Sequence, residues 1–207
     1  MLIGEGQDWL DGVERAWEIL TSLSPEGVCR KTKADFDELA GNYILPLFNE
    51  KIYISLKERR IWGYSKAADL VLNELSHYST LAALWYLIQA KDIPLSSNLV
   101  SPRESNGGLI FTQGSHVLPL KRLVKKYDDS VEKLIKRGIS LGGEQMDYGD
   151  ASVRLFPFPR VPVVLLIWKC DEEFPAHADI LFDSTCSEHL PADIIWSTAM
   201  MSILVML

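Results

Sequence analysis

Residues 151–183 read "ASVRLFPFPRVPVVLLIWKCDEEFPAHADILFD" and predict the centre of the fold. The run at 161–170 is apolar almost throughout, which is typical of a strand buried on both faces. Its neighbours, "ASVRLFPF" at 151–158 and "ADILFD" at 178–183, alternate apolar and polar residues, as strands with one covered face do. Short connections such as "DEEFPAH" join the three runs. We therefore expect an antiparallel meander.

The chain ends on the apolar run "IIWSTAMMSILVML" at 194–207, with Pro191 close to the first helical turn. The run is shorter than the roughly 20 residues that a membrane-spanning helix needs. We expect a buried helix and no membrane contact. A helix that is apolar on all sides must be covered on all sides. It either packs in the interior or is covered by another subunit, which makes a homodimer or larger assembly an alternative.

Upstream of the meander the pattern is mostly helical. Apolar spacing predicts helices over 8–23, 66–89 and 120–136, with a bend near 76–79 in the second. We also expect a second short helix in "DFDELAG" after the polar connector "SPEGVCRKTKAD". A hairpin is expected in "NYILPLFNEKIYISL", and Pro46 predicts that its first strand is an edge strand.

These elements predict an α+β fold in which an antiparallel sheet packs against several helices, including a buried C-terminal helix. At 207 residues and 47% hydrophobic content, the chain is long enough for one sizeable core. We expect one domain over 1–207, with an N-terminal helical segment at 1–40 and an α+β core at 41–207.

Charge and cysteine content restrict the classes of partner. The formal net charge of -7 argues against nucleic acid, because binding to a phosphate backbone depends on lysine and arginine. The N-terminus lacks a basic segment followed by an apolar one, so we expect no secretory signal and a cytoplasmic protein. Three cysteines, an odd and scattered set, predict free thiols.

Cysteine and histidine gather near the end of the meander. Cys186 and His189 lie three positions apart in "DSTCSEHLP", where Asp183 could cap a helical turn and place both side chains on one face. His177 begins the last predicted strand and Cys170 ends the strand before it, so a short loop would bring those two ends together. Thiolate and imidazole together suit zinc or iron.

Other interpretations of the His177, Cys186 and His189 set remain open. Asp183 or Glu188 could add an oxygen ligand to a metal, but the paired C-x-x-C spacing is missing, and spacing without it is a weak metal signal. The same residues allow a Cys–His nucleophile, although nothing marks an oxyanion hole. The interpretation that weighs most is structural: a buried thiol, a histidine capping a turn and an exposed histidine beside a hairpin.

Asp171, Glu172 and Glu173 crowd three carboxylates into the connection between two predicted strands. Crowded carboxylates raise one another's pKa unless cations or hydrogen-bond donors neutralise them. A metal, an arginine such as Arg154 or Arg160, or solvent must do so. Charge runs usually face water, which favours a solvated hairpin tip.

Phe174 and Pro175 follow these acids directly and would pin the tip against the body of the protein. A fixed acidic loop is a candidate for ligand binding, and the turn before the meander could join it. The candidate ligand-binding residues are Asp150, Glu172, Glu173, Phe174 and Asp183.

The pieces "GGEQMDYGD", "DEEFPA" and "LFDS", in this order, resemble an uncharacterised prokaryotic domain family. The likeness covers residues 40–207. The family occurs mostly in anaerobes, with some members next to iron–sulfur modules, and carries over no catalytic residue. The resemblance implies an anaerobic host, a link to redox or corrinoid proteins, and a focus on Gly142, Gly143, Asp150, Glu173, Phe174, Pro175, Phe182 and Asp183.

Two functions follow as hypotheses. The first is an accessory module that presents the acidic loop to a small-molecule ligand or a protein partner, since every catalytic set is incomplete. The second is a metal-dependent enzyme that uses His177, Cys186, His189 and nearby carboxylates, with zinc or iron as cofactor. Both require the hairpin tip, the glycine-rich turn and the segment before the last helix to meet at one edge of the sheet.

Overall fold

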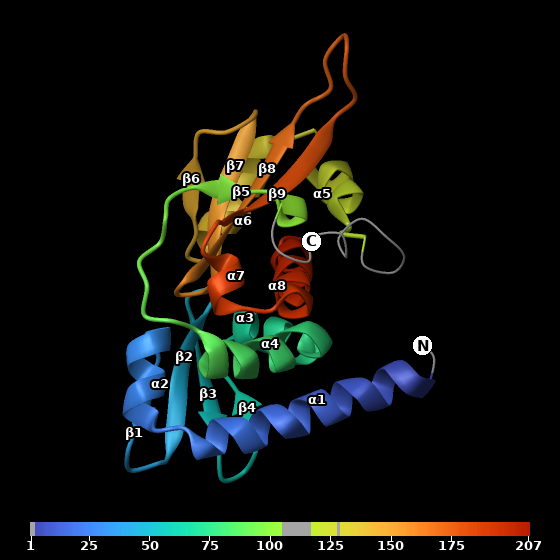
Figure 1. Cartoon of the computed structure of the whole chain (residues 1–207). Coiled ribbons are helices and arrows are strands. Elements are labelled where there is room, and N and C mark those ends of the chain that lie inside the picture. Colours follow the sequence, from blue (N-terminus) through green and yellow to red (C-terminus); the bar gives the residue numbers. More distant parts are fainter. Residues whose placement is uncertain (1–2, 105–116, 128) are drawn as a thin grey trace.

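Two antiparallel sheets and the helices around them form an α+β fold, as expected (Figure 1). The computed structural model describes residues 3–104, 117–127 and 129–207. The strand orders are β1-β2-β3-β4 and β5-β9-β8-β7-β6. The strands are β1 (Asp35–Asp37), β2 (Asn42–Leu47), β3 (Glu50–Ser55), β4 (Arg60–Trp62), β5 (Leu99–Val100), β6 (Glu144–Met146), β7 (Ala151–Phe158), β8 (Val161–Trp168) and β9 (His177–Asp183). The helical segments are α1 (Ile3–Ser22), α2 (Pro25–Thr32), α3 (Lys66–Asp69), the π-helix η1 (Leu70–Glu74), α4 (Ser76–Gln89), the 3₁₀ helix η2 (Pro102–Glu104), α5 (Leu120–Tyr127), α6 (Val131–Ser140), α7 (Cys186–His189) and α8 (Ala192–Leu204).

The predicted meander is confirmed as β7, β8 and β9, and it forms the centre of the C-terminal sheet. Helix α6 lies on the face that carries Val153, because Gly138 packs directly on that side chain. The other face carries Arg154 and Val164, which are register partners in β7 and β8. We call this second side the open face of the sheet, since it borders a hollow described below.

The N-terminal sheet joins the C-terminal sheet through the turn between β2 and β3. Phe48 and Asn49 form this two-residue turn with φ of 48° and 65°, the left-handed conformation that tight hairpins require. The Phe48 side chain is buried, and its backbone N–H donates to the carbonyl of Phe156 at 3.0 Å. The buried Phe48 side chain and this hydrogen bond therefore connect the β2–β3 turn to the C-terminal sheet.

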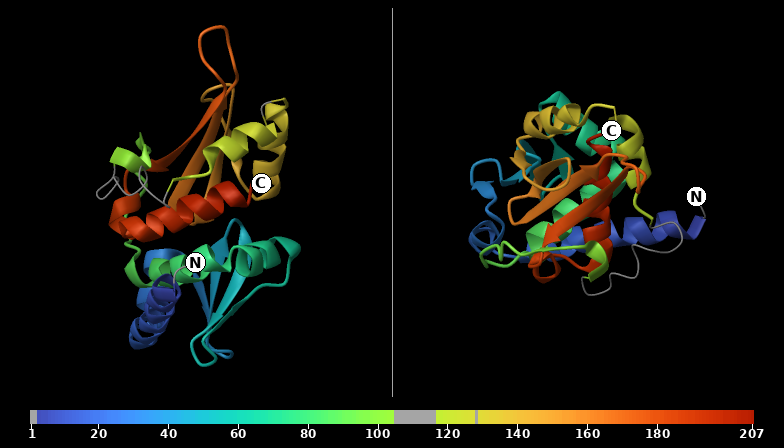
Figure 2. Two further views of the ribbon diagram at one scale, coloured as in Figure 1. Left: turned by 90° about the vertical axis from the view of Figure 1, so that its right-hand side faces the viewer. Right: turned by 90° about the horizontal axis from the view of Figure 1, so that it is seen from above.

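The C-terminal helix α8 lies between the C-terminal sheet and α4 (Figure 2). Its side chains are buried along most of its length, and Val205 and Met206 after it are also inaccessible. Arg137 donates to the carbonyl of Val205 and Tyr127 to that of Met206. The apolar run is covered by its own chain, so its composition alone does not require a second subunit. Among the described residues, no helix is both long and apolar enough to cross a bilayer.

The prediction for residues 24–41 was wrong. The expected polar connector is helix α2, in which Ser24 accepts from the amide of Gly27 and Pro25 takes the first helical position. The expected helix in "DFDELAG" is strand β1 followed by a turn. Asp37 accepts from the amides of Leu39 and Ala40, and this local bonding competes with a helix.

Two predicted helices are each divided. The long helix over 66–89 is α3, η1 and α4, and the break falls at Leu75, whose N–H donates to the carbonyl of Leu70 in π-helical spacing. The helix over 120–136 is α5 followed by α6. The predicted hairpin is confirmed as β2 and β3. The expectation that Pro46 places its first strand at a sheet edge was wrong, because β2 lies between β1 and β3. Proline is accommodated there because β1 pairs only with residues 42–44 of β2.

Candidate functional site

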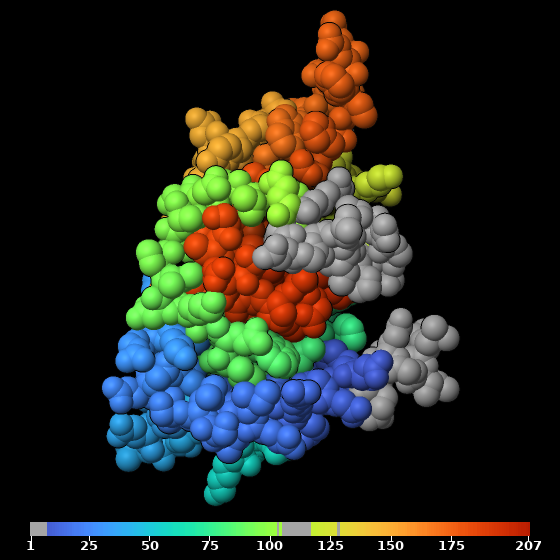
Figure 3. All heavy atoms as spheres, in the orientation of Figure 1, coloured from blue at the N-terminus to red at the C-terminus, as the bar shows by residue number. Residues whose placement is uncertain are grey.

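The connection between β8 and β9 projects beyond the rest of the molecule (Figure 3). We call residues 169–176 the projecting hairpin. The carboxylate of Asp171 accepts from the amides of Glu173 at 2.9 Å and Phe174 at 2.7 Å, and its own N–H donates to the carbonyl of Phe174. These bonds, from Phe174 first and Glu173 second, hold the pKa of Asp171 below its ordinary value. The backbone conformation of the tip is therefore determined by hydrogen bonds within the projecting hairpin.

The base of the projecting hairpin is fixed to the sheet. The rings of Trp168 and His177 are stacked, with centroids 4.4 Å apart and planes inclined by 14°. Asp150 accepts from the amide of Lys169 at 2.7 Å, and the N–H of Asp150 donates to the carbonyl of Ile167. The structure thus brings Asp150 to the base of the hairpin.

The side chains at the tip face solvent. Glu172 and Glu173 are exposed, and Phe174 keeps 61% of its surface accessible. The expectation that Phe174 pins the tip against the body is wrong, because the hairpin extends away from it. Arg154 and Arg160 do not neutralise the acids either: Arg154 pairs with Glu144, and Arg160 pairs with Asp92.

Asp183 lies at the other end of β9 and is almost fully buried. It accepts from the backbone and hydroxyl of Ser96, from the amide of Ser97 at 2.8 Å, and from the amide and hydroxyl of Thr185. Burial alone would raise the pKa of Asp183, but the bonds from Thr185 and Ser96 outweigh it and lower the pKa. Through these hydrogen bonds, Asp183 connects the loop after α4, which contains Ser96, to the turn before α7, which contains Thr185.

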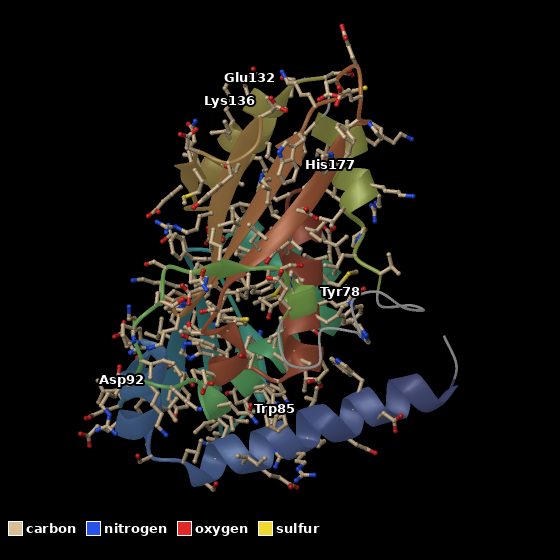
Figure 4. The ribbon with its side chains drawn as sticks, turned by 45° about the horizontal axis from the view of Figure 1, so that its top comes forward. Tyr78, Trp85, Asp92, Glu132, Lys136 and His177 are labelled. Carbon is tan, nitrogen blue, oxygen red and sulfur yellow. The ribbon has the colours of Figure 1, made fainter. Side chains whose placement is uncertain are left out.

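The predicted metal-ligand set does not converge. His177 and Asp183 are the first and last residues of the seven-residue strand β9, which separates them by roughly 20 Å. Cys186 and His189 lie on α7, which follows Asp183 in the chain, and His189 accepts a hydrogen bond from the amide of Lys91. Figure 4 shows this separation, with His177 beside the hairpin and Asp92, next to Lys91, at the opposite end. Across residues 3–104, 117–127 and 129–207, no group of three His, Cys, Asp or Glu side chains could hold a metal.

Cys186 and His189 do share one short helix, as their spacing predicted. Both are buried, and burial raises the pKa of the Cys186 thiol to about 11. Burial, followed by the positive charge of Arg160, lowers the pKa of His189. The thiol is therefore protonated at neutral pH, which does not favour the Cys–His nucleophile.

The sequence interpretation missed a hollow of about 190 Å³ on the open face of the C-terminal sheet. Ser97, Tyr148, Arg154 and Asp183 supply its polar groups. The apolar lining residues are Leu95, Leu99, Met146, Pro162 and Val164. Arg154 is only partly buried, whereas Val153 and Leu155 on either side of it are buried, which indicates that the Arg154 side chain lies on the other face of the sheet from theirs. Only the strand order shows which residues line that face beside it.

Two of the three predicted segments therefore meet at this hollow: Met146 and Tyr148 come from the glycine-rich turn, and Asp183 comes from the segment before the last helix.

A family model described as a domain of unknown function, DUF3786, matches residues 24–204. The chain belongs to the DUF3786 family. The DUF3786 match starts earlier than the predicted resemblance, so it includes α2. No curated protein and no solved structure matches the chain.

Proposed function

We propose that this DUF3786 protein is a binding or accessory protein that docks a protein partner through the projecting hairpin. The observation that carries the proposal is Phe174, which is 61% exposed on a hairpin whose shape its own hydrogen bonds determine. Covering a large apolar side chain at the end of a projection would contribute favourable free energy to binding, because it removes apolar surface from water. Exposed aromatic residues are also frequent anchors in protein interfaces.

The geometry of the hairpin supports rapid and specific docking. A loop already held in one shape loses less conformational entropy on binding than a flexible one. Glu172 and Glu173 directly precede Phe174 in the chain and are exposed, so in this proposal they favour a partner surface with basic residues next to an apolar pocket. Asp150 and Lys169 hold the base of the hairpin and do not contact the partner in this proposal.

The class of partner follows from the resemblance seen in the sequence. The resemblance implies an anaerobic host and, for some members, a neighbouring iron–sulfur module, and on this basis we propose a redox or corrinoid protein as the partner. The chain's thiols among the described residues are dispersed, with Cys29 half-buried, Cys170 exposed and Cys186 buried. In this proposal the partner carries the cofactor.

The test is a comparison of Phe174→Ser with Leu39→Ser, whose side chain is exposed by 102% in the turn after β1. A redox protein encoded beside a DUF3786 gene is purified and its affinity measured by calorimetry for wild-type protein and both variants. We expect Phe174→Ser to weaken binding at least tenfold, because interface anchors contribute about 2 kcal/mol or more. Leu39→Ser should bind like wild type. Equal affinities for all three proteins, or binding only to a site mapped elsewhere by cross-linking, would exclude the hairpin as the docking element.

A further inference from the structure

A second hollow, of about 300 Å³, lies where the two sheets meet. We call it the junction hollow. Its lining residues come from four separate parts of the chain: Lys33 after α2, Pro46 and Asn49 around the β2–β3 turn, Gly142 before β6, and Phe156 and Pro159 at the end of β7. The volume is at the lower end of the range for small-molecule sites, roughly 300–1,000 Å³, and such sites favour junctions between structural units.

The residues that line the junction hollow are mostly apolar, and one of them carries a positive charge. Pro46, Phe156 and Pro159 form its apolar walls, and Lys33 is the ionisable residue among those that line it. The guanidinium of Arg154 lies 5.6 Å from the centre of the Phe156 ring, but it is paired with Glu144, so Lys33 supplies the positive charge of the hollow. No carboxylate belongs to the described lining residues. These features favour an anion attached to a flat apolar group.

Turns and a helix end fix the backbone around the hollow in a defined shape. Lys33, Asn49 and Gly142 all have positive φ, at 59°, 65° and 72°. A Cβ on Gly142 would lie 2.3 Å from the Cβ of Asn49, so only glycine lets these two walls approach. Lys33 occupies the left-handed position after α2, where glycine or asparagine is less strained. The backbone therefore does not explain why lysine is present there.

We infer that the junction hollow binds a small molecule that combines a flat, aromatic or otherwise apolar body with an acidic group. The body lies against Phe156 and the two prolines, and the acid pairs with the ammonium of Lys33. This site is separate from the projecting hairpin. It therefore stands or fails independently of the proposed docking function.

The inference is tested with two matched fluorescent probes on full-length, folded protein. The first is 1-anilinonaphthalene-8-sulfonate, which carries an acid group, and the second is N-phenyl-1-naphthylamine, which has the same rings without the charge. We expect saturable one-site binding of the sulfonate, weakened at least fivefold by Lys33→Gln and unchanged by Lys57→Gln, an exposed lysine in the β3–β4 turn. The uncharged probe should bind equally to both lysine variants.

Backbone NMR and thermal unfolding accompany the titrations, because the sulfonate also binds partly unfolded chains. The expected shifts concern the amides of Asn49 and Gly142. Phe156→Leu should weaken both probes; if that variant unfolds, the lysine pair still decides the result, since Lys33 and Lys57 are exposed. Equal affinity of the sulfonate for wild type and Lys33→Gln, binding without saturation, or shifts confined to other surfaces would overturn the proposal.

Discussion

Asp183 on β9 accepts two hydrogen bonds from Ser96, 87 positions earlier in the chain, one from its backbone N–H at 3.1 Å and one from its hydroxyl at 2.9 Å. A third residue, Ser97, donates to the other carboxylate oxygen. A buried carboxylate that receives several donors is a structural link, because each donor would lose its partner if the carboxylate were removed. This link forms one wall of the hollow on the open face.

Replacing Asp183 with alanine should lower the free energy of unfolding by about 3 kcal/mol, since the donors of Ser96, Ser97 and Thr185 all lose a buried, charged acceptor. Urea unfolding at pH 7 measures the loss. Asp179→Ala, an exposed position on the same strand, is the control and should change stability by less than about 0.5 kcal/mol. An equal effect of the two substitutions would contradict the structural role of Asp183.

The same carboxylate predicts a pH dependence. Its pKa in the folded protein lies below the ordinary value, so its stabilising contribution is present above the unfolded pKa of about 4 and is lost as pH falls through the folded pKa. The stability difference between wild type and Asp183→Asn should therefore narrow from pH 6 to pH 3. A difference that stays constant over this range would show that the charge of Asp183 does not contribute.

His189 predicts a second, separate pH effect. Burial lowers its pKa, so below about 6.5 the unfolded chain takes up a proton that the folded protein resists, and stability falls. Asparagine can retain an acceptor near the position of Nδ1, which accepts from the amide of Lys91 at 3.2 Å. His189→Asn should therefore reduce the loss of stability between pH 7.5 and pH 5.5, as measured by thermal unfolding. An equal loss of stability in wild type and His189→Asn over this range would contradict a buried, neutral His189 as its source.

The three thiols should react with iodoacetamide in an order set by exposure and pKa. Cys170 is exposed and should be modified first at pH 8. Cys29 is half-buried, and burial together with the charge of Asp35 raises its pKa, so it should react more slowly. Cys186 should react only after unfolding, because burial raises its pKa to about 11. Peptide mass spectrometry gives the rates; modification of Cys186 as fast as Cys170 would be inconsistent with the fold.

Two helix glycines should respond oppositely to alanine. In α1, a Cβ on Gly12 would make ordinary contact with Leu81 at 3.8 Å, so Gly12→Ala should stabilise the protein by up to about 1 kcal/mol. In α6, a Cβ on Gly138 would meet Val153 at 2.1 Å, so Gly138→Ala should destabilise it by about 1 to 3 kcal/mol. Thermal unfolding of both variants checks the sign of each change.

Glu173→Gln should leave thermal stability nearly unchanged or slightly raised, because its exposed side chain lies in a crowd of carboxylates and only its backbone N–H supports the turn. Asp171→Ala removes the acceptor of that turn and should increase hydrogen exchange within residues 171–174. A marked loss of stability in Glu173→Gln would make the residue structural and would weaken its assignment to a binding surface.

The meander and the C-terminal helix could be predicted from the sequence because their signals are local. β8 is apolar at nearly every position, and α8 is apolar around its whole circumference, so both must be buried whatever their neighbours are. The helix α2 could also have been found: Ser24 and Pro25 form a capping signal that the polar composition of the segment concealed.

The arrangement of the candidate site depended on tertiary structure. The alternation in β9 predicts which side chains share a face, and the extended strand by itself separates His177 from Asp183. Only the tertiary structure shows which loops lie against each end of that strand. Residues close in sequence were thereby separated, and Ser96 and Tyr148, far from Asp183 in the chain, were brought next to it. Local pattern determines what is buried; only the strand order and the packing of loops across it determine which polar groups meet.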